Sequence, residues 1–165
     1  VKHMPGHGRT RVDSHHDLPV LDVALDDLDT TDFAPFRALS DLPLGMTAHI
    51  RLTQLDERPA TASLAAIRLI RERIGFKGLL MSDDIGMNAL SGTPAERAAA
   101  AIAAGCDLVL ACNLTRAEFE QVSEAAGRMS PKAQVRATTA LARRGPPDPA
   151  SPADLRAELA ALLAG

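Results

Sequence analysis

The chain has 165 residues, a length typical of one domain, and 46% of them are hydrophobic, enough for a sizeable core. Aromatic residues make up 2%, with no Trp or Tyr, so the core is expected to be aliphatic. This scarcity argues against a broad aromatic platform for sugars and against single-strand nucleic-acid binding. The net charge of −3, from 18 basic and 21 acidic residues, indicates no polyanionic partner.

Two cysteines, Cys106 and Cys112, lie in an apolar run. They are too few for a disulfide framework and fit a reducing compartment, and we expect both to be small buried side chains. The sequence shows no signal peptide and no apolar span long enough for a membrane helix, so no membrane association is expected. Because the chain opens with Val1 directly before a polar cluster, we expect it to be cut from a longer protein.

Four short apolar runs, each followed by polar or small residues and then by a helical pattern, succeed one another along the chain. Such runs predict buried parallel strands. The first run keeps only Val1, and the others are Leu44–Ala48, Gly78–Met81 and Cys106–Ala111.

Helical patterns separate and follow these runs, at Thr31–Leu39, Ser63–Ile74, Thr93–Ala104 and Arg116–Arg128. The third has the clearest boundaries, because Thr93 is a good N-cap, Pro94 takes the first helical position and Gly105 follows the end. The alternation predicts an α/β protein with a parallel sheet. A full (β/α)₈ barrel takes roughly 250 residues, so four units predict either half a barrel or a small open sheet.

The composition changes after Arg128, which divides the chain into a partial barrel over 1–128 and a helical tail over 129–165. A proline-rich linker at 145–152 interrupts the tail. A last helix, Ala153–Leu163, is expected to pack on the domain surface, since an amphipathic helix normally hides its apolar face. That face carries Leu155, Leu159, Leu162 and Leu163.

Four of the five histidines lie within residues 3–16, in a long loop rich in Gly and Pro, and this concentration predicts a functional loop. Asp13 and His15, two residues apart, can face the same side, where a carboxylate would fix the tautomer of the imidazole. A structural hydrogen bond is the alternative for this pair. A metal site using His3 and His7 is disfavoured, because Pro5 and Gly6 between them rule out the helical spacing of a zinc motif.

Two adjacent carboxylates, Asp83 and Asp84, follow the third apolar run. Near a buried strand they are costly unless they are paired or used, and one could be a nucleophile. The alternative is a capping or salt-bridging role, which suits Asp84 better than Asp83. His49, at the end of the second run, could line the same pocket or be a satisfied core histidine.

Five segments together resemble family 3 glycoside hydrolases, and most closely the bacterial β-N-acetylglucosaminidases of cell-wall recycling. The resemblance covers residues 1–113 and implies a TIM-type barrel whose C-terminal half is this chain. Met4 stands where the family commonly has Phe. In order, the segments read KHMPGHGRTRVDSHHDLP, MTAHI, PATASL, IGFKGLLMSDDIGMNAL and AIAAGCDLVLACN.

The resemblance implies a retaining exo-β-N-acetylglucosaminidase of the cytoplasm that trims muropeptides and needs no cofactor or metal. Asp83 would be the nucleophile, His15, oriented by Asp13, the acid/base, and Lys2 and His3 would bind sugar hydroxyls. The missing N-terminal half of the barrel would supply further sugar contacts. Two alternatives remain, a truncated non-catalytic remnant of such an enzyme and a metal-binding module built on the histidine cluster.

Overall fold

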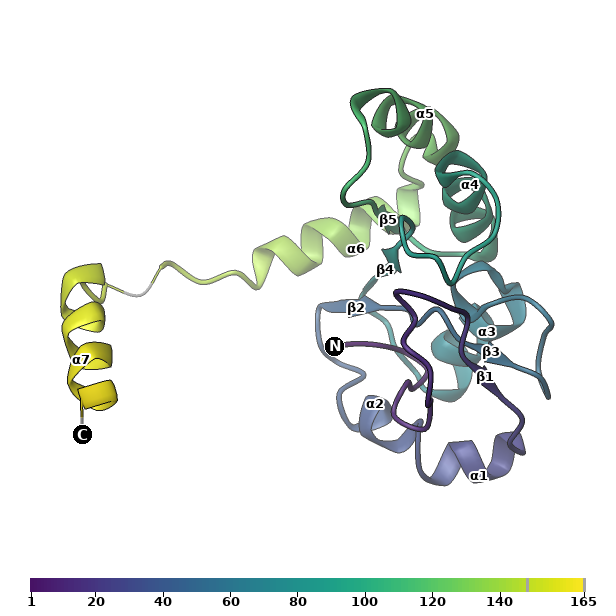
Figure 1. The fold of residues 1–165 in the computed structure, drawn as a ribbon, viewed down its shortest axis with the longest axis horizontal. Helices are drawn as coiled ribbons and strands as arrows, with labels where there is room; N and C mark the ends of the chain where they lie inside the picture. The colour runs from purple at the N-terminus through teal and green to yellow at the C-terminus, as the bar shows by residue number, and fades with distance from the viewer. Residues whose placement is uncertain (148, 165) are drawn as a thin grey trace.

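The computed structural model describes residues 1–147 and 149–164 (Figure 1). Asp148 and Gly165, which fall in the predicted linker and tail, lie outside the described residues. In chain order the elements are β1 Val20–Leu21, α1 Leu25–Thr30, α2 Ala34–Ala38, β2 Leu44–Met46, β3 Arg51–Leu52, η1 Ala60–Ala62, α3 Leu64–Arg68, η2 Leu69–Arg73, β4 Leu79–Asp84, α4 Pro94–Ala104, β5 Leu108–Leu110, α5 Arg116–Ala126, α6 Pro131–Ala142 and α7 Pro152–Ala164.

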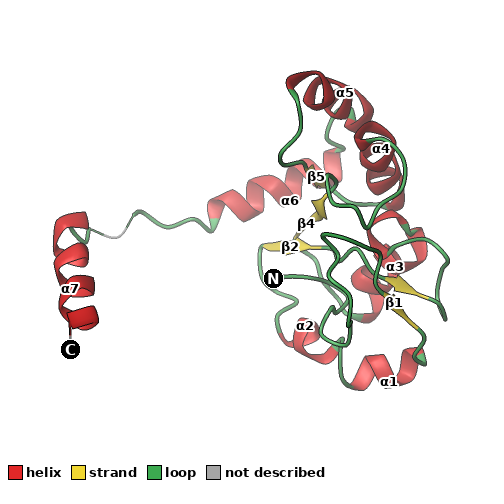
Figure 2. Ribbon diagram, in the orientation of Figure 1, coloured by secondary structure: helices red, strands yellow, loops and turns green. Residues whose placement is uncertain are grey.

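The central sheet is parallel, in the order β2-β4-β5, and helices lie around it (Figure 2). Residues Val1–Met4 run along the outer side of β2, where the N–H of Met46 donates to the Val1 carbonyl at 3.0 Å and Met4 bridges to Thr47. All four predicted runs are therefore spatial neighbours in sequence order, and the predicted α/β fold with parallel strands is confirmed. A second parallel pair joins β1 to β3.

Strand β4 is longer than the apolar run that predicted it. The prediction ended at Met81, but the strand continues through Ser82 and the two carboxylates to Asp84. Ser82 is buried, and its hydroxyl accepts the N–H of Leu110 at 3.0 Å, so a polar side chain supplies a link to β5 where the ladder register shifts. Asp83 thus belongs to the end of a strand rather than to a loop beyond it.

The predicted helix boundaries are confirmed where caps mark them. Thr93 and Glu96 form a reciprocal capping box at the start of α4, and Gly105 ends it with φ +113°, a conformation that other residues resist. Ser63 caps α3 by accepting the N–H of Ala66 at 3.1 Å. The predicted single helix Ser63–Ile74 is present but widens into a π-helical turn over η2.

The shortest helices and strands were not predicted from the sequence. Helix α1 has six residues, and β1 and β3 have two each. Elements of this length offer too few positions for a hydrophobic period to show. Helix α6 was also not predicted as a separate helix, and α2 is shorter than the expected Thr31–Leu39.

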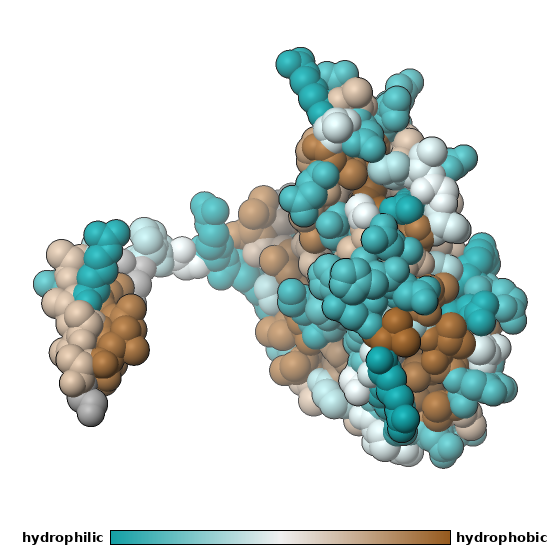
Figure 3. Space-filling model, viewed as in Figure 1, coloured by the Kyte–Doolittle hydropathy of each residue, from teal (hydrophilic) through white to brown (hydrophobic). Residues whose placement is uncertain are grey.

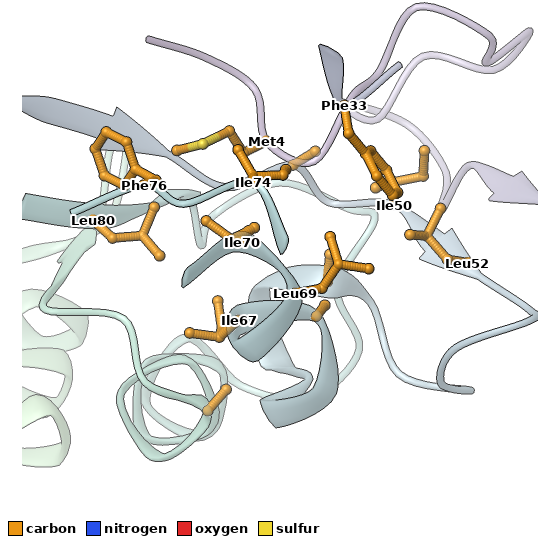
Figure 4. Packing of buried hydrophobic residues seen from close by; sticks show 14 of the residues in the cluster. Met4, Phe33, Ile50, Leu52, Ile67, Leu69, Ile70, Ile74, Phe76 and Leu80 are labelled. Atoms are coloured by element: carbon orange, nitrogen blue, oxygen red, sulfur yellow. The ribbon is translucent and has the colours of Figure 1, made fainter. Parts of the chain in front are cut away.

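A mainly aliphatic core fills the space between the sheet and helices α3 and η2 (Figure 4). Two of the four phenylalanines, Phe33 and Phe76, are fully buried within it. Gly45 in β2 is required by this packing, because a Cβ there would overlap the side chains of Met4 and Phe76. A smaller cluster under α4 and α5 contains Ile85, Leu90, Ala98 and Val122.

The two cysteines differ. Cys106 is buried, and desolvation raises the pKa of its thiol to about 12, so it is an inert part of the core as predicted. Cys112 is only half-buried, which corrects the expectation that both are buried. Cys112 lies two residues beyond the end of β5, outside the buried part of the sheet.

Helix α7 does not pack on the domain, contrary to the prediction. None of its side chains over Pro152–Ala164 is buried, and Figure 3 shows a hydrophobic stripe along it that faces solvent. The predicted stripe of Leu155, Leu159, Leu162 and Leu163 is 53–79% exposed. The linker explains this, since Pro146, Pro147 and Pro149 favour extended backbone that carries α7 away (Figure 1).

Helix α6 lies beyond the predicted division at residue 128 yet contacts the body of the fold, with Ala133 buried. The division itself stays a prediction. In the described part of the chain, no helix is both long and apolar enough to span a membrane.

Candidate active site

Asp83 occupies the carboxyl end of β4, the central strand of the sheet. Its side chain is 14% exposed. One carboxylate oxygen, Oδ1, accepts the N–H of Asp84 at 2.9 Å, and the other, Oδ2, lies 3.6 Å from Nε2 of His3. A carboxylate can accept about four hydrogen bonds, so Asp83 keeps most of its lone pairs available at a partly open position.

Asp84 has different surroundings, although it is the adjacent residue. Its Oδ1 accepts the N–H groups of Gly86 and Cys112, each at 2.9 Å. The carboxylate therefore ties the turn after β4 to the turn after β5. This arrangement matches the structural role that was the alternative for Asp84.

Lys2 and His3 lie at the end of the N-terminal segment that runs along β2. Lys2 is exposed, whereas His3 is half-buried with its ring against Asp83. Partial burial lowers the pKa of His3 despite the opposing attraction of Asp83. His3 is therefore neutral at pH 7 and can both donate and accept hydrogen bonds beside the Asp83 carboxylate.

Asp13 and His15 are in direct contact within the loop of residues 5–19. Nδ1 of His15 lies 2.8 Å from Oδ1 of Asp13, and the same oxygen accepts the backbone N–H of His15 at 2.9 Å. These two hydrogen bonds lower the pKa of Asp13, which keeps it ionised. Because a carboxylate only accepts, Nδ1 carries the proton, and Nε2 is left for exchange with a substrate.

The loop is anchored at two points along its length. Near its start, Arg9 donates to Asp32 Oδ2 at 2.6 Å and to the Thr31 hydroxyl at 2.8 Å. Further along, the carbonyl of His15 accepts the N–H of Asn88 at 3.4 Å. Asn88 follows β4 by four residues, so this bond joins the loop at His15 to the segment after β4. The pair itself is open to solvent, with 61% and 71% of the two side chains exposed.

His49 is a satisfied core histidine, which decides between the two interpretations of it. It is fully buried, with Nδ1 at 2.7 Å from the Thr61 hydroxyl and Nε2 at 2.9 Å from the Asp84 carbonyl. Thr61, 12 residues away, was not singled out from the sequence. Its position in the PATASL segment was the available signal.

The histidines of the N-terminal loop do not converge on a metal site. The rings of His3 and His7 have centroids 6.1 Å apart and are tilted by 59°. Nδ1 of His7 is 3.0 Å from the Thr10 hydroxyl. Among residues 1–147 and 149–164, no three His, Cys, Asp or Glu side chains are grouped as metal ligands would be.

The site therefore offers a carboxylate at the carboxyl end of β4 and a His–Asp pair on a loop bonded to the segment after β4. The carboxyl end of a parallel sheet is where α/β barrels and open sheets carry their chemistry. A groove of about 650 Å³ lies elsewhere, between α6 and residues 40–43 before β2, and none of the predicted site residues lines it.

The sequence model of the glycosyl hydrolase family 3 N-terminal domain matches residues 1–142. The β-hexosaminidase of Tolumonas auensis is 42% identical over 120 residues, which are 68% of this chain and 35% of that protein. The β-hexosaminidase of Chromobacterium violaceum is 44% identical over 117 residues, with 68% and 33% covered. The chain thus spans about a third of the length of these relatives.

Solved structures show the same likeness. A glycoside hydrolase family 3 β-N-acetylglucosaminidase from Paenibacillus sp. str. FPU-7 superposes with a TM-score of 0.74 at 31% identity, over 92% of this chain and 33% of that one. Native NagZ from Neisseria gonorrhoeae gives 0.71 at 34% identity, over 87% of this chain and 46% of that one.

Proposed function

Because the chain belongs to glycosyl hydrolase family 3, we propose that the protein hydrolyses terminal β-linked N-acetylglucosamine, with Asp83 as nucleophile and His15 as acid/base. The observation that carries this proposal is the contact between His15 and Asp13 on a loop bonded to the segment after β4. This contact supports the proposal because it joins the loop that carries His15 to the segment after the strand that carries Asp83. The β-hexosaminidase and β-N-acetylglucosaminidase names of the relatives support the sugar.

The reaction proceeds in two steps with retention. In the first, Asp83 attacks the anomeric carbon while Nε2 of the His15 imidazolium protonates the leaving oxygen, which gives a covalent glycosyl-enzyme. In the second, neutral His15 removes a proton from water, and the water displaces Asp83. Asp13 stabilises the imidazolium and keeps its Nδ1–H in place throughout. Lys2 and His3 bind sugar hydroxyls beside the nucleophile.

The substrates are N-acetylglucosamine-containing fragments of peptidoglycan, processed in the cytoplasm. These finer assignments rest on the resemblance to the cell-wall recycling enzymes that the motifs of residues 1–113 carry. The site is open and carries no aromatic platform, because the chain has four Phe and no Trp or Tyr. Recognition by hydrogen bonds to hydroxyl and acetamido groups suits such a site.

Activity needs the rest of a barrel. In the proposed enzyme, Val1–Met4, β2, β4 and β5 supply one half of a (β/α)₈ barrel. In the described residues, neither outer edge of this sheet pairs with another strand. Open edges invite association, and an open site loses the preorganised surroundings that stabilise a transition state. The 165-residue chain by itself is therefore inactive and self-associates, like a non-catalytic remnant.

A hybrid protein tests both parts of the proposal. The part of the Tolumonas auensis β-hexosaminidase that precedes its match to this chain is joined to residues 1–165, here called the hybrid enzyme, and assayed with 4-nitrophenyl N-acetyl-β-D-glucosaminide. We expect hydrolysis by the hybrid enzyme, the β-anomer as the first product by NMR, and no hydrolysis by the chain alone. A folded hybrid without hydrolysis contradicts the proposed function, and a first-formed α-anomer contradicts the retaining mechanism. A monomeric, fully active 165-residue chain contradicts the need for the other half.

A further inference from the structure

A chain of buried hydrogen bonds runs from the interior of the fold to the end of β4. His49, Thr61 and Thr47 are each fully buried. The Thr47 and Thr61 hydroxyls are 2.8 Å apart, Thr61 is 2.7 Å from Nδ1 of His49, and Nε2 of His49 is 2.9 Å from the Asp84 carbonyl.

The direction of these bonds follows from what each group can do. The Asp84 carbonyl only accepts, so Nε2 of His49 carries a proton. Burial lowers the pKa of His49, which makes the ring neutral at pH 7 and leaves Nδ1 as an acceptor. The Thr61 hydroxyl has two acceptors within reach of its one proton, Nδ1 of His49 at 2.7 Å and the Ala48 carbonyl at 3.1 Å, and its oxygen accepts from the Thr47 hydroxyl. The Asp84 carbonyl and the burial of the ring therefore select one tautomer of His49, whose single N–H points at Asp84.

The acceptor carbonyl belongs to Asp84, the residue that follows the proposed nucleophile, and the N–H and carbonyl of Asp84 lie in consecutive peptide units that meet at its Cα. The N–H of Asp84 donates to Oδ1 of Asp83 at 2.9 Å, while the carbonyl of Asp84 accepts from His49. The Asp84 side chain is held separately by the N–H groups of Gly86 and Cys112. His49 is thus a buried side-chain donor to the carbonyl of Asp84, the residue whose N–H bonds the Asp83 carboxylate.

We propose that His49 is a positioning residue for the reaction proposed above: its Nε2–H holds the Asp84 carbonyl and thereby keeps the Asp83 carboxylate aligned for attack. The inference rests on the proposed function, because alignment matters only if Asp83 attacks a substrate. His49 touches neither substrate nor reacting atoms. A shift of about 1 Å at a reacting group can cost on the order of 10²-fold in rate.

Two amide substitutions separate the two nitrogens of His49. In His49→Gln the side-chain amide reaches the place of Nε2 and can still donate to the Asp84 carbonyl. In His49→Asn the amide reaches only the place of Nδ1, so it keeps a partner in Thr61 and leaves the Asp84 carbonyl without its donor. Thr47→Val is the control, because it removes the far end of the network and leaves the bond between His49 and Asp84 in place.

The kinetics of the hybrid enzyme test the proposal. We expect His49→Asn to lower kcat about 10²-fold with KM changed by less than about threefold, since the sugar contacts are elsewhere. His49→Gln should recover kcat to within about tenfold of the parent, and Thr47→Val to within about twofold. Equal kcat values for the parent and the Asn and Gln variants would overturn the positioning role while leaving the proposed function intact.

Two further outcomes are distinct from that one. An inactive parent hybrid enzyme contradicts the proposed function, and the positioning role with it. If His49→Asn does not fold, ¹⁵N-histidine NMR of the parent decides: a proton on Nε2 and none on Nδ1 supports the proposal. The opposite tautomer, or a charged ring at pH 7, overturns it.

Discussion

The two ends of the central sheet each hold an acidic residue, and they treat it in opposite ways. At the amino end, Asp107 is buried and accepts from Arg71 and Arg136 at 2.7 Å each and from the N–H of Leu80 at 2.9 Å. At the carboxyl end, Asp83 accepts one N–H and lies 3.6 Å from a half-buried histidine. An aspartate side chain thus stabilises the fold where its carboxylate has a full set of donors, and it is available for chemistry where donors are missing.

The sharpest test of this comparison is removal of the nucleophile. In the hybrid enzyme, Asp83→Asn should lower turnover by roughly 10⁴-fold or more, as expected when a nucleophile is lost. Asp84→Asn should leave measurable activity, because Asp84 acts through Gly86 and Cys112 rather than on the sugar. Steady-state rates with the nitrophenyl substrate check both variants. Equal losses in the two, or an active Asp83→Asn, would contradict the assignment.

The corresponding change at the amino end should affect stability instead. Asp107→Ala leaves Arg71 and Arg136 facing each other without their carboxylate, which costs about 3–5 kcal/mol for a buried pair that loses one partner. Urea unfolding of the hybrid enzyme measures this, and kcat below the unfolding transition should be unchanged. Glu120→Ala is the control, because its ion pair with Arg116 is exposed and contributes only about 0.3–0.5 kcal/mol. A large fall in kcat for Asp107→Ala with no change in the free energy of unfolding would contradict a purely structural role for Asp107.

His15→Ala should give a leaving-group-dependent loss. Without a proton donor, cleavage of a natural disaccharide should fall by about 10²-fold or more. Cleavage of an activated aryl glycoside should fall less, because its leaving oxygen needs no proton. His16→Ala, at the neighbouring exposed position, serves as the control and should behave like the parent. The same loss on both substrates would show that His15 binds or supports structure instead.

Acidification should weaken the carboxyl end before the amino end, and this is the smallest of the expected effects. Burial lowers the pKa values of His49 and His3, so below about pH 6.5 the unfolded chain binds more protons than the folded one. Their contribution to stability is therefore present above that pH and is lost as pH falls through the folded-state pKa values. Hydrogen exchange between pH 8 and 5 should show earlier opening around His49 than around Asp107. Simultaneous opening around His49 and around Asp107 would argue against a pH-dependent loss of stability at the carboxyl end.

Much of the fold follows from the sequence where signals are local. The apolar runs predicted β2, β4 and β5, and Thr93 and Gly105 marked both ends of α4, because caps and buried strands depend on neighbouring residues. The contact of Asp13 with His15 was also within reach, since two residues separate them.

The remainder depends on groups that meet only after folding. The partners of Asp107 come from residues 71 and 136, and the partner of His49 is a carbonyl 35 residues away. No periodicity reports such pairings. The expectation that α7 packs on the domain was wrong for a different reason. The leucine pattern of α7 is a local signal that predicted the helix correctly, but the proline-containing linker determines whether the helix can reach the domain surface.

The ion pair between Arg136 and Asp107 also bears on where the chain can be divided. A shortened protein that stopped at residue 128 would keep the sheet but lose Arg136 and the buried Ala133, leaving Asp107 with half of its cationic partners in the described structure. A protein that stopped between residues 143 and 147 would retain both residues. Of the described helices and strands it would lose only α7, whose side chains are all exposed. The useful boundary for crystallisation or for exchanging segments between proteins is therefore after α6, where, among the described residues, the loss of a segment removes no buried charge pair.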